Sequence, residues 1–96
     1  MATESQLQSK IIKHLHSLGC YTMKNDPRHR AGVPDLAFWH TEMVGFIEVK
    51  AHENSPFRPL QKPTIERLQN MGIFVAVIYT ENWEEYKEKF NLWMGE

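Results

Sequence analysis

Residues 32–38, Gly-Val-Pro-Asp-Leu-Ala-Phe, and residues 46–50, Phe-Ile-Glu-Val-Lys, are the two segments that decide the fold of this chain. Both are apolar runs with the composition of strands, and the link between them at residues 40–43 is short and polar. Turn residues bracket each run. The pattern therefore predicts that residues 35–39 and 44–51 form two strands joined as a hairpin.

Three charged side chains, Asp35, Glu48 and Lys50, lie within these apolar runs. Since side chains alternate along a strand, Glu48 and Lys50 project from one face. Asp35 begins the neighbouring strand, and paired strands lie about 4.8 Å apart, so Asp35 and Glu48 could reach one cation. A buried charge must be paired or coordinated, and Mg²⁺ prefers carboxylate oxygens. The pattern indicates metal-assisted hydrolysis, in which Lys50 lies beside an attacking water or stabilises charge on a phosphate.

A second interpretation of the same residues needs no metal. Glu48 and Lys50 would then form a solvated strand face, and Asp35 would be a turn residue after Pro34. Three fixed letters are a loose pattern, so the residues by themselves leave both interpretations open.

The flanking sequence alternates between helical and strand patterns. Apolar residues recur at helical spacing over residues 4–18, with a predicted N-cap at Thr3 and a stop at Gly19. Residues 20–24 are a short predicted strand. Residues 73–79 are a β-rich apolar run, which predicts a fully buried strand.

Two further helices are predicted around that buried strand. The first ends near Gly72, and it starts either at Pro59 or near Lys62, where Pro63 would cost no helical hydrogen bond. The second begins near Asn82 and carries an aromatic stripe, for which we favour a place in the core over a dimer surface. The stripe consists of Trp83, Tyr86, Phe90 and Trp93.

Size and composition indicate one small globular domain over residues 1–96, with 42% hydrophobic and 24% charged residues. The longest apolar run is far shorter than the roughly 20 residues that a membrane helix needs. The first residues do not have the order of a signal peptide, and a single cysteine fits a reducing compartment. We therefore expect a cytoplasmic protein without a membrane segment.

The charges are distributed unevenly along the chain, although the net charge is only −1. Residues 1–62 carry eight Lys and Arg against six Asp and Glu, whereas residues 63–96 carry three against six. If DNA binds, it is expected to meet the first two thirds of the chain.

Taken together, these segments resemble the VRR-NUC (virus-type replication-repair nuclease) domain, a branch of the PD-(D/E)XK nuclease superfamily. The resemblance runs collinearly from residue 4 to about residue 79. It implies an α/β restriction-endonuclease-like core of the order αβββαβ, with an added C-terminal helix and a mixed sheet flanked by helices. The matching elements are Glu4-Ser5, Gly32-Val33-Pro34-Asp35, Ile47-Glu48-Val49-Lys50-Ala51, Pro59-Leu60-Gln61, and residues 68–72 leading into 75–78.

The resemblance also implies roles for the charged residues of the two strands. Asp35 and Glu48 would be the metal ligands, and the backbone carbonyl of Val49 would complete the protein's share of the coordination. Lys50 would be the catalytic lysine. The expected cofactor is Mg²⁺ or Mn²⁺, and no small-molecule cofactor is expected.

Two helical residues complete the implied catalytic set. Glu4 would approach the metal, directly or through water, and Gln61 would support Lys50 or the scissile phosphate. The alternatives are a first-turn glutamate favoured by the helix dipole and an exposed helix glutamine. The chain departs from the family pattern at Arg58, where a small capping residue is common, and at Pro63, which follows Gln61 closely.

Five basic residues lie in or beside the loops next to the proposed site. They are candidates for phosphate contacts, and ordinary surface charge is the alternative for each of them. The five are Lys24, Arg28, Arg30, Arg58 and Lys62.

The sequence thus predicts a Mg²⁺- or Mn²⁺-dependent DNA endonuclease of a bacterial or phage-infected cell. Stand-alone family members resemble homodimeric cutters of branched DNA, so a four-way (Holliday) junction is the expected substrate and a second copy the expected partner. A catalytically silent module that binds branched DNA is one alternative. A nuclease or nickase that acts on linear duplex DNA is another.

Overall fold

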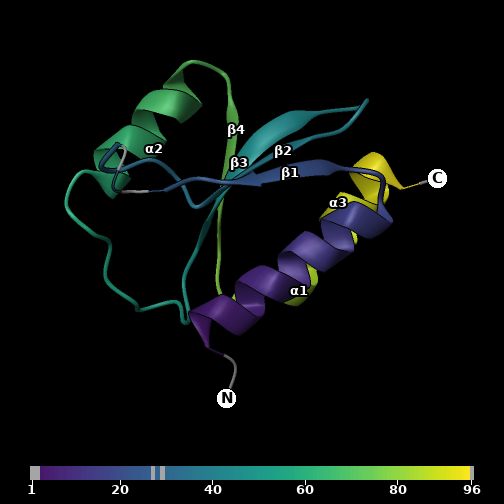
Figure 1. Cartoon of the computed structure of the whole chain (residues 1–96), viewed down its shortest axis with the longest axis horizontal. Coiled ribbons are helices and arrows are strands. Elements are labelled where there is room, and N and C mark those ends of the chain that lie inside the picture. Colours follow the sequence, from purple (N-terminus) through teal and green to yellow (C-terminus); the bar gives the residue numbers. More distant parts are fainter. Residues whose placement is uncertain (1–2, 27, 29, 96) are drawn as a thin grey trace.

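The computed structural model describes residues 3–26, 28 and 30–95. Over these residues the chain forms a four-stranded sheet, three α-helices and one short 3-10 helix (Figure 1). The order αβββαβ followed by a C-terminal helix confirms the predicted fold class. The elements are α1 Glu4–Ser17, β1 Tyr21–Lys24, β2 Leu36–Trp39, β3 Val44–Val49, α2 Gln61–Asn70, β4 Phe74–Ile78, η1 Thr80–Asn82 and α3 Trp83–Met94.

The sheet is mixed and its strands stand in the order β1-β2-β3-β4. β1, β2 and β3 pair antiparallel, as expected for a hairpin extended by a preceding strand. β3 and β4 pair parallel, with Glu48 opposite Val77, because α2 carries the chain back between them. β4 is an edge strand, so the prediction of a fully buried strand is wrong in part: Phe74 and Val77 are only half-buried.

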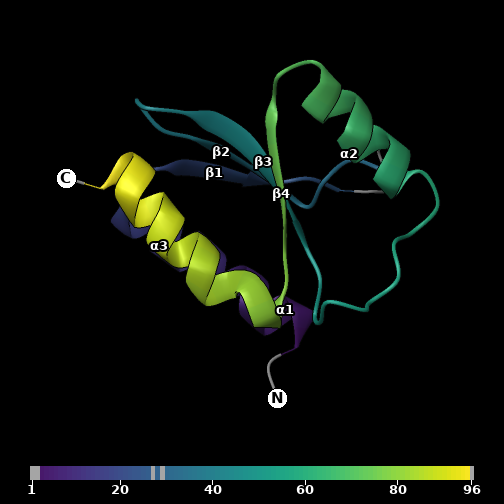
Figure 2. The same cartoon turned by 180° about the vertical axis from the view of Figure 1, so that it is seen from behind.

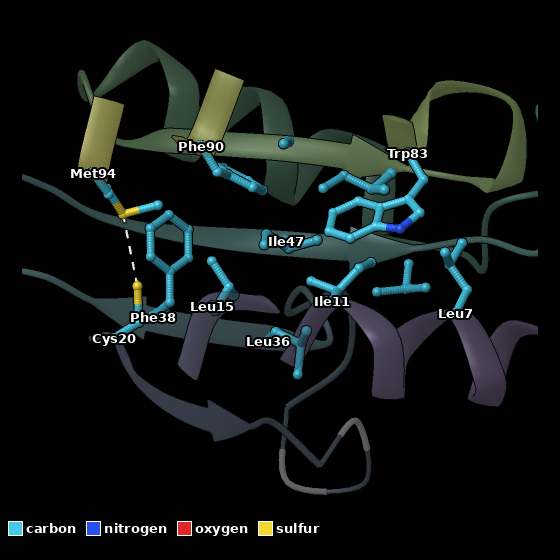
Figure 3. Packing of buried hydrophobic residues seen from close by; sticks show 13 residues of the cluster. Leu7, Ile11, Leu15, Cys20, Leu36, Phe38, Ile47, Trp83, Phe90 and Met94 are labelled. Atoms are coloured by element: carbon cyan, nitrogen blue, oxygen red, sulfur yellow. Dashed lines mark hydrogen bonds between the residues drawn. The ribbon is translucent and has the colours of Figure 1, made fainter. Parts of the chain in front are cut away.

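The main hydrophobic core lies between the sheet and the pair α1 and α3, which run side by side in both views (Figures 1 and 2). In Figure 3, Ile11 of α1 lies below Ile47 of β3 in the view and Phe90 of α3 lies above it, so both helices contribute to one cluster. Trp83 and Phe90 are buried, which confirms the core interpretation for these two, whereas Trp93 remains 39% exposed. The sheet face turned away from this core is the one that α2 partly covers.

The helix termini follow the local sequence. Thr3 caps α1 in a reciprocal capping box with Gln6, as its position predicted. α2 begins at Gln61, so Pro63 lies in the first turn, where its missing N–H has no intrahelical acceptor to lose. This agrees with the predicted start near Lys62 and excludes a start of α2 at Pro59. Within the described ranges, no helix is both long and apolar enough to cross a bilayer.

Candidate active site

The carboxylates of Asp35 and Glu48 meet where β2 separates from β3. The Val49 N–H donates to Asp35 Oδ2 at 2.8 Å, and the Asp35 N–H donates to Glu48 Oε1 at 3.2 Å. The last paired residues of the two strands are Leu36 and Ile47, so these side-chain bonds continue the ladder where backbone pairing stops. Each carboxylate is therefore held by the backbone of the neighbouring strand, and both project into the same space.

The backbone of Val49 also faces this space. In an antiparallel ladder the N–H and C=O of one residue point to the same side of the strand. Because the Val49 N–H reaches Asp35, the Val49 carbonyl is directed to that side as well. A third oxygen ligand is thus available beside the two carboxylates.

Lys50 and Gln61 form the buried side of the site. Lys50 Nζ donates to Gln61 Oε1 at 2.9 Å and to the Pro56 carbonyl at 3.1 Å, and it lies 3.4 Å from Glu48 Oε2. Gln61 Nε2 donates to Glu48 Oε2, and Gln61 Oε1 also accepts from the Arg58 N–H at 2.8 Å. Gln61 is fully buried, so the alternative of an exposed helix glutamine is wrong. Its amide links the lysine to the carboxylate.

Glu48 carries an unusual charge environment. Burial and the neighbouring Asp35 carboxylate raise the pKa of Glu48 from 4.5 to about 7, against the opposing effect of Lys50 and Gln61. A second ionised carboxylate, on the half-buried Asp35, makes ionisation of the buried Glu48 costly. A cation between them would remove this cost, which fits the predicted metal site.

The donor set suits a hard cation better than zinc. No group of three or more His, Cys, Asp or Glu side chains comes together in the part of the chain that the structure describes. Two carboxylates and a carbonyl leave half of an octahedral shell to water, and Mg²⁺ and Mn²⁺ commonly retain several water ligands. These residues therefore fit the expected ion.

A pocket of about 250 Å³ opens over these groups. Glu4 lines it from the start of α1 but does not join Asp35 and Glu48 in a three-carboxylate cluster, which favours an approach through water over direct ligation. Arg58 Nη2 lies 3.8 Å from Asp35 Oδ1. The full lining consists of Glu4, Asp35, Glu48, Lys50, Ala51, Ser55, Pro56 and Arg58.

Sequence reasoning missed the contribution of residues 55–57. The carbonyl of Pro56 fixes Lys50, and the ring of Phe57 lies 4.8 Å from Lys50 Nζ in a cation–π contact. Such contacts stabilise an ammonium over an aromatic face. The available signal was Phe57, an aromatic residue between Pro56 and Pro59. Its partner Lys50 directly follows β3, so the local sequence did not predict the contact.

The other predicted phosphate contacts lie outside this pocket. Lys24, Arg28, Arg30 and Lys62 are exposed and do not line it. Arg28 pairs with Asp26 at 2.8 Å. Arg30 instead lines a second groove beside α2. Of the five basic candidates, the structure brings only Arg58 to the carboxylates.

The mixed sheet and the paired carboxylates beside a lysine are the features of a restriction-endonuclease-like α/β core. A family model described as the VRR-NUC domain matches residues 2–82. A solved structure described as a VRR_NUC domain superposes with a TM-score of 0.76 at 27% identity, over 93% of this chain and 95% of that one. The chain belongs to the VRR-NUC family of nucleases. None of the curated protein sequences is significantly similar to it.

Proposed function

We propose that this protein is a Mg²⁺- or Mn²⁺-dependent DNA endonuclease and that residues 1–96 act as a single nuclease domain. The observation that carries the proposal is the pair of backbone hydrogen bonds that hold the two carboxylates, Val49 N–H to Asp35 and Asp35 N–H to Glu48. They lie beside the buried pair of Lys50 and Gln61. Family membership supports nuclease chemistry on DNA. The repulsion between the buried Glu48 carboxylate and the half-buried Asp35 carboxylate supports the metal requirement.

In this mechanism Asp35, Glu48 and the Val49 carbonyl hold the cation. The ion would supply charge for the developing phosphorane and would favour hydroxide over water. Lys50 has three N–H donors, of which Pro56 and Gln61 occupy two. The remaining acceptor beside Nζ is Glu48 Oε2, at 3.4 Å. Lys50 also lines the pocket, where its ammonium charge can favour an attacking hydroxide or stabilise charge on a phosphate oxygen. Gln61 positions Lys50, and Arg58 binds the phosphate that flanks the cleaved bond.

A cleavage assay with matched variants tests this function. Three variants keep the side-chain size but remove a charge: Asp35→Asn, Glu48→Gln and Lys50→Met. Each is expected to abolish cleavage in Mg²⁺ and in Mn²⁺, and the circular dichroism spectrum is expected to stay unchanged. Lys87→Ala, on α3, is the control and is expected to cleave as the wild type does. Wild-type rates in the Lys50→Met protein would exclude Lys50 from the mechanism.

We further propose that the substrate is branched DNA, such as a four-way junction, and that two copies act on the two symmetric strands. Membership of the VRR-NUC family, whose members the sequence analysis associates with branched DNA, is the basis of this choice. A panel of linear, flapped, forked and four-way DNA, together with the solution mass of the protein, tests it. Binding without cleavage in either ion would indicate a silent DNA-binding module, and cleavage of linear duplex alone would overturn the substrate assignment.

A further inference from the structure

A second groove, of about 520 Å³, lies between α2 and the residues that lead into β2. Its lining combines apolar side chains with two exposed arginines, and none of the described residues that line it is acidic. The residues that matter for the argument are Arg30, Val33, Phe46, Leu60, Arg67 and Leu68.

This groove lies next to the active-site pocket, although the two share no lining residue. Phe46, in its floor, precedes Glu48 by two positions on β3, so both side chains project from the same face about 7 Å apart. Leu60, at its edge, directly precedes Gln61, the residue that links Lys50 to Glu48. A polymer that enters the active site therefore passes beside this groove.

The backbone at the groove is held in two restricted conformations. Gly32 has φ +86°, and a Cβ there would stand 2.5 Å from the Leu60 carbonyl oxygen and 2.6 Å from Thr64 Oγ1. Glycine is thus required for the loop to lie against α2. Leu60 itself has φ 72°, which is strained for a residue with a branched side chain.

The strain at Leu60 does not serve the hydrophobic core. Its side chain is 57% exposed at the groove instead of being buried. Strained conformations are retained mainly where function requires them. An exposed leucine held in this way next to Gln61, the residue that positions Lys50, suggests a contact with a ligand.

We propose that this groove binds an unpaired base of the DNA substrate, with Phe46 and Leu60 packed against the base and Arg30 and Arg67 on the adjoining phosphates. The proposal rests on the proposed nuclease function and specifies what the site recognises. A base offers apolar faces, and its backbone is anionic, so it complements an apolar floor between two cations. The volume lies within the range of pockets that enclose small ligands. In a continuous duplex each base is stacked and paired, so only a branch or a single-stranded arm presents one that is free to enter.

A binding experiment without divalent metal tests the groove separately from catalysis. In EDTA, fluorescence anisotropy measures the Kd for a duplex with a short single-stranded arm and for the same DNA with abasic nucleotides in the arm. The wild type is expected to prefer the arm with bases about fivefold or more, because each stacked base contributes on that order. Leu60→Gly, which keeps the positive φ, is expected to bring the ratio close to one, because it removes a side chain that packs against the base. Arg67→Ala is expected to weaken binding of both arms, because it removes a phosphate contact that the two arms share. The control Lys87→Ala is expected to keep the wild-type ratio.

Three results would overturn the proposal. The first is equal affinity of the wild type for the two arms. The second is a loss of base preference in Lys87→Ala as large as the loss in Leu60→Gly. The third is a change of solution mass in the groove variants, which would assign the groove to a second copy. Its failure is distinguishable from failure of the nuclease function. Base preference without cleavage of any DNA would remove the nuclease function alone, and cleavage without base preference would remove the groove alone.

Discussion

Replacing Glu48 by glutamine should change how the stability of the protein depends on pH. Burial and the Asp35 carboxylate raise the pKa of Glu48 to about 7 in the folded protein, from 4.5 for the free group. The folded state therefore holds this proton more tightly than the unfolded state. The stabilisation is complete below about pH 4.5 and is lost as the pH rises through 7.

The size of the effect follows from the shift. A pKa difference of between two and three units corresponds to about 3 kcal/mol of the free energy of unfolding. Glu48 is 1% exposed, so solvent screens little of this energy. The Glu48→Gln protein lacks the titrating group and should not show this loss. The difference between the two proteins is expected to change by about 3 kcal/mol between pH 4 and pH 8.

Urea denaturation in EDTA at a series of pH values measures this difference. Mg²⁺ should offset the loss in the wild type at high pH, because a cation binds the ionised carboxylates of the folded state only. Glu42→Gln, at an exposed carboxylate of the β2–β3 link, is the control and should keep the wild-type pH dependence. Parallel stability curves for wild type and Glu48→Gln would refute the reasoning.

Three further outcomes are expected. Gln61→Leu removes the buried amide that hydrogen-bonds both Glu48 and Lys50, so urea denaturation should show a loss of about 1–3 kcal/mol and cleavage should fall with it. Gly32→Ala should lower the melting temperature and reduce cleavage, since its Cβ would collide with the backbone of Leu60. The control Gly19→Ala has open space around the added Cβ and should lower the melting temperature less. Phe57→Leu removes the ring over Lys50 and should weaken cleavage by about fivefold in a single-turnover assay, with no change in fold.

Much of the fold was predictable because its elements have clear local periods. The helical spacing of Leu7, Ile11 and Leu15 located α1, and all three are buried. The alternation along β3 placed Glu48 and Lys50 on one face, where the structure has them 3.4 Å apart. The family resemblance added the collinear order, which the family model and the solved structure confirm.

The groove beside α2 was not predictable in this way. Its two cations are Arg30 and Arg67, and in the sequence β2, β3 and the first part of α2 lie between them. No local sequence pattern therefore connects them. The positive φ of Leu60 had no signal either, because glycine is the residue that usually marks such a conformation. Gln61 was expected near the site, but its burial and its three hydrogen-bond partners depend on where α2 packs.

By itself, the sequence predicted where the strands and helices lie, with the start of α2 left open, and it placed Asp35, Glu48 and Lys50 on neighbouring strands near one another. The period of the hydrophobic residues and the residue types of turns are local properties, so they can be recognised in the sequence without the tertiary structure. Only the tertiary structure decided how these groups interact: the Asp35 carboxylate on the Val49 N–H, the buried amide between Lys50 and Glu48, and the open groove beside them. These contacts join residues distant in sequence, and they exist only once the sheet has formed and α2 has closed over one end of it.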